Sequence, residues 1–427
     1  MRPVVNIVIG AVCLFLSACT KTSNEPTPVP EQEYTPSEMQ KSLKRGVAFG
    51  KGDCPWYDED LSLMSPALSW SYNWSEQPQD EVISAWFDAN KMDYCPMAWN
   101  GNYNANRLRN YVATHPGCKY LLAFNEPNLK DQARMTPQQA AAQWPALKAL
   151  AQELNLQLVS PAMNYGTLEG YSDPIKWLDE FFACDGVSVD DVSAMAVHCY
   201  MATPGALKSY VERFAKYNKP VWVTEFCAWE AYAIHSEEDQ IRYMCEVLHY
   251  MEQSSLVERY AWFIPRAKTG YPYMQLLTDE KPIQLTNAGK VYCGISSMDT
   301  TAWLDGLKEV SAADYIQLSS DAIQVRPSSR SNHLMLYSLS AGQKVSYQIC
   351  LTKEVSTMTI HYSSPYTTSQ VLLYHNDALQ TMVDLPKTEE ASGWGSVDVP
   401  VSFAKGDHVV RIGGYEGDAN IDGFIFK

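Results

Sequence analysis

Between residues 45 and 293 the sequence repeats one pattern, a short apolar run, a polar loop rich in aromatic residues and then an amphipathic helix. Near-continuous apolar character is typical of parallel strands buried on both faces. Eight such units within about 250 residues predict a (β/α)8 TIM barrel, with a domain over residues 43–298. An open doubly wound sheet is the alternative, but no glycine-rich dinucleotide fingerprint follows the first run, which favours the barrel. The eight runs are 46–50, 67–74, 92–99, 120–125, 156–161, 192–200, 220–226 and 259–264.

Helix start signals follow several of these runs. Thr136, Asp173 and Thr203 each stand directly before a proline, the arrangement of an N-cap residue with proline at the first helical position. Ser236 precedes three acids at 237–239, which are favoured at the positive end of a helix dipole. These signals place helices between the predicted strands.

After residue 299 the pattern changes to short β-rich runs separated by turns, with no amphipathic helix. Runs of this length and spacing predict an all-β antiparallel sandwich over residues 312–427. The runs are 315–318, 333–339, 346–351, 357–362, 371–374, 396–401, 408–412 and 421–426.

The first 19 residues have the features of an export signal. Arg2 precedes an apolar run at 4–16 that is too short to span a bilayer comfortably. The sequence at 16–19, Leu-Ser-Ala-Cys, resembles a bacterial lipobox, which predicts lipidation of Cys19; an ordinary secretory signal cut near Ala18 is the alternative. Residues 20–42, rich in Pro, Ser and Thr, predict a solvated tether. We therefore expect an exported protein anchored by lipid to a bacterial membrane, at the cell surface or the periplasmic face, and not transmembrane.

Charge and composition narrow the function. Lys and Arg total 33 against 49 Asp and Glu, so the net charge of −16 argues against a nucleic-acid or anionic-membrane surface. The eight histidines and the cysteines show no metal-ligand spacing, so we expect no catalytic metal or redox cofactor. The aromatic content of 12% suits a sugar-binding cleft, although a large core also uses such residues.

Two acids stand at the ends of predicted strands. Glu126 follows the fourth run, where Pro127 biases it away from helix, and Glu225 ends the seventh. A buried acid costs free energy unless it is paired, hydrogen-bonded or functional. The alternative to a catalytic role for each acid is a purely structural one, in which an Arg or backbone donors satisfy the carboxylate. Two carboxylates across the mouth of one barrel are what glycoside hydrolysis needs, one as proton donor and one as nucleophile. Asn125 is suited to binding the sugar 2-hydroxyl.

Five segments in order are similar to a known family. They read SWSYNW at 69–74, CPMAW at 95–99, LLAFNEPN at 121–128, VHCY at 197–200 and YAWF at 260–263. They resemble glycoside hydrolase family 128 of clan A, whose catalytic core would cover about residues 44–296. The resemblance implies a retaining, endo-acting hydrolase of β-1,3-glucan, with Glu126 as general acid/base and Glu225 as nucleophile. We expect a monomer.

Further candidate residues lie at the predicted strand ends. His198 and Tyr200 are expected to orient Glu225 or to bind the sugar at the cleavage point, and aromatic residues at the same rim to stack on sugar faces. Core packing is the alternative for each of them. The aromatic candidates are Tyr72, Trp74, Trp99 and Trp262, with Trp229 and Tyr232 in the loop after Glu225.

The C-terminal region has a weaker resemblance. Residues 394–399, 404–411 and 420–426 resemble carbohydrate-binding module family 6, a galactose-binding-like jelly roll. The resemblance implies sugar contacts by Asn420 and Trp394. The opening E-A-E-x-Y of that family is replaced here from Ala312 to Tyr315, so a purely structural sandwich is the alternative.

Three functional hypotheses follow. The first is the retaining endo-β-1,3-glucanase. The second keeps the chemistry with another β-linked glycan, because family resemblance does not fix every subsite. The third is a non-catalytic surface lipoprotein that captures glycan; the presence of both Glu126 and Glu225 in full motif context argues against it.

Overall fold

The computed structural model describes residues 33–50, 55–230, 232–266, 272–389 and 393–427. The export signal with Cys19, and most of the predicted tether, lie outside these ranges. Within them, no helix combines the length and the apolar character needed to cross a bilayer.

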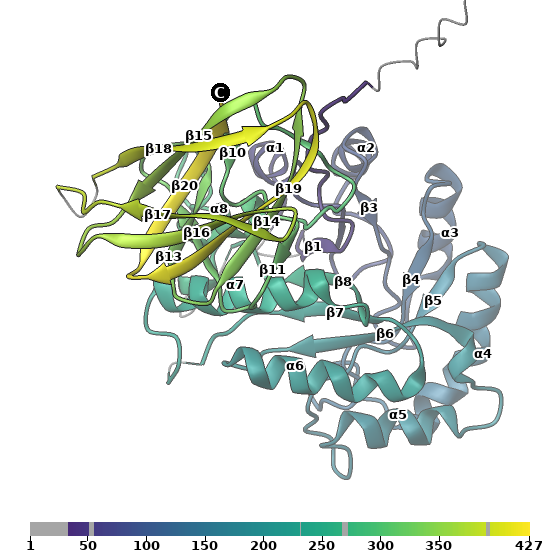
Figure 1. Cartoon of the computed structure of the whole chain (residues 1–427). Helices are drawn as coiled ribbons and strands as arrows, with labels where there is room; N and C mark the ends of the chain where they lie inside the picture. Colours follow the sequence, from purple (N-terminus) through teal and green to yellow (C-terminus); the bar gives the residue numbers. More distant parts are fainter. Residues whose placement is uncertain (1–32, 51–54, 231, 267–271, 390–392) are drawn as a thin grey trace, which may run out of the picture. The chain divides into compact units, whose positions relative to one another are not determined.

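Eight parallel strands form a curled, TIM-like sheet in the order β3-β2-β1-β8-β7-β6-β5-β4 (Figure 1). The two ends of this order are joined beyond β3 by a bridge between Met97 and Leu122, with Ala98 N donating to Leu122 O at 2.9 Å. All eight predicted strands are present. They are β1 (Arg45–Ala48), β2 (Trp70–Tyr72), β3 (Asp93–Tyr94), β4 (Tyr120–Leu122), β5 (Gln157–Val159), β6 (Val192–Cys199), β7 (Val221–Phe226) and β8 (Val257–Trp262).

A helix follows each strand, and the predicted caps are confirmed. The Thr136 side chain accepts from Gln139 N while the Gln139 side chain accepts from Thr136 N, a reciprocal capping box. The helices are α1 (Asp58–Met64), α2 (Glu81–Ala89), α3 (Ala105–Thr114), α4 (Pro137–Glu153), α5 (Pro174–Phe182), α6 (Pro204–Glu212), α7 (Glu237–Gln253) and α8 (Asn287–Gly294), with 3-10 turns η1 (Val189–Asp191), η2 (Arg213–Tyr217) and η3 (Pro272–Met274).

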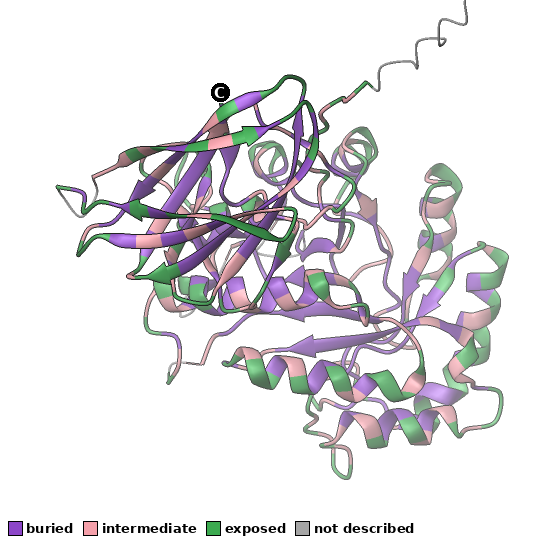
Figure 2. Cartoon of the chain, viewed as in Figure 1, coloured by how far each residue is buried: buried purple, intermediate pink, exposed green. Residues whose placement is uncertain are grey.

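The curled sheet is buried on both faces, and Figure 2 shows its strands buried while the helices expose one side. A cluster inside the sheet includes Trp70, Tyr72 and Trp222, all fully buried. A second cluster fills the space between strands and helices. Burial on both faces explains why the strands read as continuous apolar runs in the sequence.

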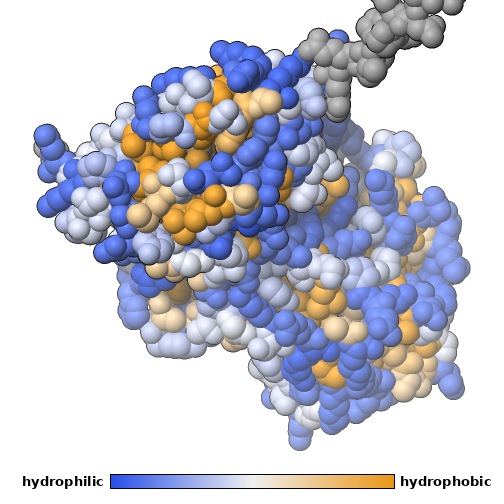
Figure 3. Space-filling view, viewed as in Figure 1, coloured by the Kyte–Doolittle hydropathy of each residue, from blue (hydrophilic) through white to orange (hydrophobic). Residues whose placement is uncertain are grey.

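The C-terminal region is an all-β sandwich of two six-stranded, mainly antiparallel sheets. One has the order β12-β13-β20-β15-β18 with β10 on β20, and the other β11-β14-β19-β16-β17 with β9 on β14. The strands are β9 (Leu304–Asp305), β10 (Val310–Ser311), β11 (Gln317–Leu318), β12 (Gln324–Pro327), β13 (Leu334–Leu339), β14 (Lys344–Leu351), β15 (Val355–Ser363), β16 (Ser369–His375), β17 (Ala378–Leu385), β18 (Gly395–Phe403), β19 (Gly406–Glu416) and β20 (Ala419–Phe426). In Figure 3 hydrophilic residues cover most of the visible face, and hydrophobic residues gather over these sheets.

Residues 34–427 form one compact unit, because the sandwich packs directly on helix α7. Arg326 of β12, 6% exposed, lies 3.0 Å from both oxygens of Glu238 at the start of α7. His249 near the end of the same helix is fully buried, with its Nδ1 2.9 Å from the carbonyl oxygen of Asp321. One side of α7 therefore serves the barrel and the other the sandwich.

Candidate active site

Glu126 and Glu225 lie at the carboxyl ends of their strands, and each is nearly buried, 6% and 4% exposed. Glu225 is the fifth residue of β7. Glu126 follows β4 by four residues, and its N–H donates to Ala162 O at 3.0 Å. Its φ of +44° lies in the left-handed region, which a non-glycine residue rarely adopts and which often marks a functional position.

His198 of β6 lies between the two acids. Its Nδ1 is 2.9 Å from Glu126 Oε1 and 3.3 Å from Glu225 Oε2. Because both oxygens contact one nitrogen, they are no farther apart than the sum of these two distances. That limit, which applies to these two oxygens, is compatible with the roughly 5–5.5 Å between the carboxyl groups of retaining glycosidases.

Glu225 is surrounded by donors on both oxygens. Tyr72 Oη donates to Oε1 at 2.9 Å and Trp74 Nε1 donates to the same oxygen at 2.7 Å, while the Tyr200 hydroxyl bonds Oε2. An indole N–H can only donate, so this arrangement suits the ionised carboxylate. The predicted residues Tyr72, Trp74 and Tyr200 therefore contact Glu225 itself rather than lining the outer cleft alone.

Glu126 is bonded on one oxygen. Asn164, in the loop after β5, donates from Nδ2 to Oε1 at 3.0 Å, and His198 contacts the same Oε1. Among the described residues, no donor lies within hydrogen-bond distance of Oε2. Asn164 was missed by the sequence analysis, because it follows a short strand in a loop without a distinctive motif.

The three groups shift one another's pKa values. Burial raises the pKa of Glu126, but the charge of His198 and the bonds from His198 and Asn164 outweigh burial and hold that pKa below its usual value. Burial raises the pKa of Glu225, the charge of Glu126 adds to it, and the result lies above the usual value despite His198, Tyr200 and Trp74. Burial lowers the pKa of His198, but both carboxylates outweigh it and raise that pKa. The site therefore holds two acids and one base that compete for protons.

An aromatic wall adjoins Glu225. Trp229 stacks on Tyr200 with ring centres 4.1 Å apart and planes 3° from parallel. Phe263, directly after β8, meets Tyr200 edge-on at 5.4 Å and Trp74 at 5.8 Å. Phe263 was not singled out from the sequence, although it adjoins a residue that was.

The position of that neighbour, Trp262, differs from the prediction. The expectation that Trp262 lines the cleft is wrong, because its side chain is fully buried and its Nε1 donates to Met274 O at 2.8 Å. It packs edge-on against Phe226, ring centres 5.1 Å apart, and near Tyr292 of α8. Successive strand residues point to opposite faces, so Trp262 faces the helices.

The remaining predicted residues occupy the rim. Trp99 is partly exposed, and its carbonyl oxygen accepts from Asn125 N at 2.9 Å. Asn125 is 4% exposed and its Nδ2 donates to Gln132 Oε1 at 3.3 Å, while its Oδ1 is buried without a partner. An unpartnered buried acceptor beside Glu126 is suited to a substrate hydroxyl.

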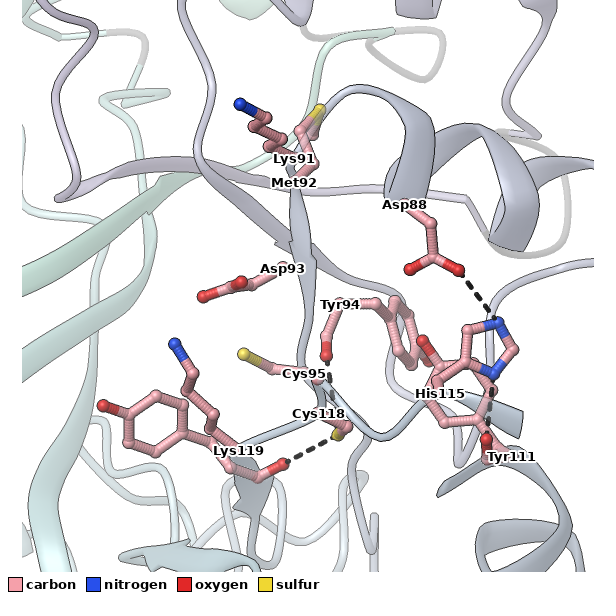
Figure 4. A pocket seen from close by; sticks show the side chains of 12 residues that line it. Asp88, Lys91, Met92, Asp93, Tyr94, Cys95, Tyr111, His115, Cys118 and Lys119 are labelled. Carbon is pink, nitrogen blue, oxygen red and sulfur yellow. Dashed lines mark hydrogen bonds and ion pairs between the residues drawn. The ribbon is translucent and has the colours of Figure 1, made fainter. Parts of the chain in front are cut away.

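A hollow of about 180 Å³ lies at the opposite, amino end of β3 and β4 (Figure 4). It includes Cys95 and Cys118, and His115, which bonds Tyr111 O at 2.9 Å and lies 3.6 Å from Asp88. In TIM-like folds, residues at this end serve stability and those at the carboxyl end serve catalysis. We therefore assign the chemistry to the site around His198.

In the sandwich, Trp394 and Asn420 flank the end of β15, through the pairs Tyr362–Gly395 and Ser363–Asn420. Asn420 Oδ1 accepts from Ser338 N at 2.9 Å, so this oxygen supports the local backbone. Trp394, partly exposed, donates to Ser329 Oγ at 3.0 Å. No group of three or more metal-binding side chains gathers within the described ranges.

Known proteins resemble the barrel region. Residues 46–292 match the glycosyl hydrolase catalytic core family. A family 128 (subgroup II) endo-β-1,3-glucanase from Pseudomonas viridiflava is 39% identical, over 59% of this chain and 98% of that one, with a TM-score of 0.53. A subgroup II enzyme of the same description from Sorangium cellulosum is 33% identical, over 58% and 97%, with a TM-score of 0.51.

A curated relative is more distant. Alkali-sensitive linkage protein 1 of Schizosaccharomyces pombe is 27% identical over 238 residues, which are 54% of this chain and 40% of that protein. The chain thus spans less than half the length of that relative. The match over more than half of the present chain, together with the subgroup II structures, shows that the chain belongs to the glycosyl hydrolase catalytic core family, within glycoside hydrolase family 128.

Proposed function

We propose that the protein is a retaining hydrolase of β-1,3-glucan, endo-acting, in which Glu225 is the nucleophile and Glu126 the general acid/base. The observation that carries the chemistry is the pair of buried carboxylates sharing one nitrogen of His198. The proposed substrate is supported by the family 128 endo-β-1,3-glucanase structures, which align with this chain over nearly their whole length.

The reaction takes two displacements. A Glu225 oxygen attacks the anomeric carbon, the glycosidic C–O bond breaks, and the leaving oxygen takes a proton from Glu126. Water then attacks the same carbon and passes a proton to Glu126 while the bond to Glu225 breaks. The product keeps its anomeric configuration, and both carboxyl groups return to their starting protonation.

The directions of the two pKa shifts, taken alone, assign these roles the other way round. The hydrogen-bond donors around the two carboxylates support the proposed assignment instead. Tyr72, Trp74 and Tyr200 hold Glu225 as an acceptor on both oxygens, whereas Glu126 keeps Oε2 open for a proton. A glycan bound over Glu126 also removes it from water, which raises its pKa toward that of an acid.

The substrate is tested by product analysis on linear β-1,3-glucan and, separately, on mixed-linkage glucan, β-1,4-glucan and mannan. We expect short oligosaccharides from β-1,3-glucan alone. Cleavage of another glycan instead would keep the mechanism and replace the substrate. Binding without cleavage would return the protein to the glycan-capture hypothesis.

Azide distinguishes the two roles. With Glu126→Ala, azide should intercept the glycosyl-enzyme and give a glycosyl azide of retained configuration. With Glu225→Ala, azide should attack the substrate directly and give the inverted product. The opposite pairing of configuration with variant would reverse the assignment.

The sandwich is proposed to be a galactose-binding-like jelly roll that binds glycan near Trp394, like modules of family 6. Its support is the placement of Trp394 and Asn420 beside one strand end, with the largely exposed Tyr366 after β15. The test is calorimetry of the Glu225→Gln protein with laminari-oligosaccharides, with and without Trp394→Ala. An unchanged binding stoichiometry would leave the sandwich with a structural role.

We also propose export and lipid anchoring at Cys19, supported by the sequence at residues 1–19. Metabolic labelling with palmitate should mark the wild type and not Cys19→Ala. Label in both proteins would contradict the lipobox.

A further inference from the structure

We infer that Asn164 is a positioning residue that gives the two oxygens of Glu126 different tasks, with Oε1 held in place and Oε2 carrying the transferred proton. This inference rests on the proposed role of Glu126 as general acid/base. No sequence motif singles out Asn164, and its proposed role follows from its hydrogen bond to Glu126.

Two hydrogen-bond partners of Glu126 converge on one oxygen, and the two carboxylates beside His198 Nδ1 favour a proton on that nitrogen, which makes it a donor. Asn164 Nδ2 lies 3.0 Å and His198 Nδ1 2.9 Å from Oε1. An oxygen that accepts two hydrogen bonds has no direction left for its own proton, so protonation of Glu126 falls on Oε2. His198 is itself titratable, whereas the amide of Asn164 donates in every protonation state of the site.

The orientation of the Asn164 amide is fixed by its other end. Asn164 Oδ1 accepts from the N–H of Tyr165 at 2.8 Å, which only the oxygen of the amide can do. The nitrogen is therefore the atom that faces Glu126.

The backbone of Asn164 is clamped to the loop that carries Glu126. Asn128, fully buried, donates from Nδ2 to Asn164 O at 2.7 Å. The carbonyl oxygen of Asn128 accepts from Thr167 N at 3.1 Å and from Leu168 N at 2.9 Å. Asn128, two residues after Glu126, thus ties the loop after β4 to the loop after β5 through its side chain and its carbonyl oxygen.

The clamp leaves no room for adjustment at Gly166. A Cβ at this position would lie 2.1 Å from Tyr171 O and 2.6 Å from Asn128 Nδ2, both far inside contact distance. Only glycine allows the loop to approach Asn128 this closely. The position of Asn164 is consequently set by packing as well as by hydrogen bonds.

Without Asn164, Glu126 loses one of the two bonds that hold Oε1. The carboxyl group can then rotate, and its proton can reside on the oxygen that faces His198 instead of the leaving group. The loss should therefore appear only when the leaving oxygen needs a proton, as general acid catalysis requires.

The experiment compares two substrates for Asn164→Ala. On a laminari-oligosaccharide, whose leaving alcohol needs protonation, we expect kcat/KM to fall roughly 10- to 100-fold, a part of the usual general-acid contribution. On a dinitrophenyl β-glycoside of the same sugar, whose leaving group departs unprotonated, we expect a change below roughly threefold. Equal losses on both substrates, or no loss on either, would overturn the inference.

Two further measurements separate this role from a structural one. Asn164 lowers the pKa of Glu126, so its removal should raise that pKa. In the glycan complex, where Glu126 acts as the acid, the alkaline limb of the kcat profile should move to higher pH. Asn110→Ala, on an exposed face of α3, is the matched control. It should change neither kcat/KM on either substrate nor the pH profile. An unmoved alkaline limb would contradict the inference.

Glu126→Ala, assayed beside Asn164→Ala, separates the inference from the proposed function. If only Glu126→Ala distinguishes the two leaving groups, the inference about Asn164 fails and the role of Glu126 stands. If neither variant distinguishes them, the role of Glu126 fails as well.

Discussion

The two ends of the curled sheet compensate charge in opposite ways. At the amino end, Arg259 lies 4.7 Å from the Trp222 ring and 4.9 Å from the Tyr120 ring, and its guanidinium bonds Asp93 at 2.7 Å. At the carboxyl end, Glu126 and Glu225 share the single imidazole of His198. At the amino end, where the charges only support the fold, they are neutralised one to one, whereas the site that must exchange protons keeps an excess acid.

The largest expected effect comes from removing that excess. Glu225→Gln should lower the hydrolysis rate by roughly 10⁴-fold or more, as removal of a nucleophile usually does. Stability should be unchanged or slightly higher, because one of two facing acids is gone. Reducing-sugar release and thermal unfolding measure the two quantities. A variant that loses stability instead would show that the carboxyl end also supports the fold.

A buried imidazole away from both ends provides a second test. Burial lowers the pKa of His249 to about 4, against an ordinary value of 6.5, since the packed sandwich removes it from water. Between pH 6.5 and 4 the His249 imidazole is protonated in the unfolded chain but neutral in the folded one. The free energy of unfolding is therefore at its full value above pH 6.5 and falls as the pH drops toward 4. The loss should reach about 3 kcal/mol at most. Denaturant unfolding across pH 4–8 should show it.

His249→Gln is the control for this titration. Glutamine keeps a donor and an acceptor near Asp321 and Tyr315 but does not titrate in this range. The difference in unfolding free energy between wild type and variant should narrow as the pH falls. A difference that stays constant with pH would contradict a buried neutral imidazole.

At the amino end, the same logic predicts a change in stability alone. Arg259→Met should lower the unfolding free energy by about 2 kcal/mol, because the rings of Trp222 and Tyr120 lose their cation. The loss should be no larger, because Asp93, 40% exposed, keeps access to water without its partner. The kcat/KM of the folded protein should be unchanged. A reduced kcat/KM would mean that the two ends are coupled through the sheet interior.

The smallest effect concerns Trp262, which lies in the core and not, as predicted, in the cleft. Trp262→Phe should cost about 1 kcal/mol through the lost volume and the lost bond to Met274 O. The KM for laminari-oligosaccharides should change less than roughly twofold. A larger rise in KM would restore this residue to the cleft.

Much of the molecule follows from local sequence. The eight strands and the caps at Thr136, Asp173, Thr203 and Ser236 were predictable, because burial on both faces and capping chemistry each leave a short-range signature. The placement of Glu126 and Glu225 at one end follows from the same pattern, since the carboxyl ends of parallel strands meet at one face.

The parts that could not be predicted depend on contacts distant in sequence. β17 exposes most of its residues at a sheet edge and so has no apolar run, and β12 reads only Gln-Val-Arg-Pro. Whether Trp262 or Phe263 faces the cleft depends on where β8 ends. The bond from Asn164 to Glu126 joins two loops 38 residues apart, which no local pattern encodes.

The shared helix α7 limits how this chain can be recombined. The solved chain of the Pseudomonas viridiflava enzyme aligns over 98% of its length with 59% of this chain. Here Cys245 and His249 of α7 are fully covered, and Glu238 is bonded by Arg326. A barrel excised at residue 298 would present a thiol, a neutral imidazole and an apolar strip to solvent. We therefore expect that the barrel region cannot be produced without the sandwich unless the face of α7 that contacts the sandwich is redesigned.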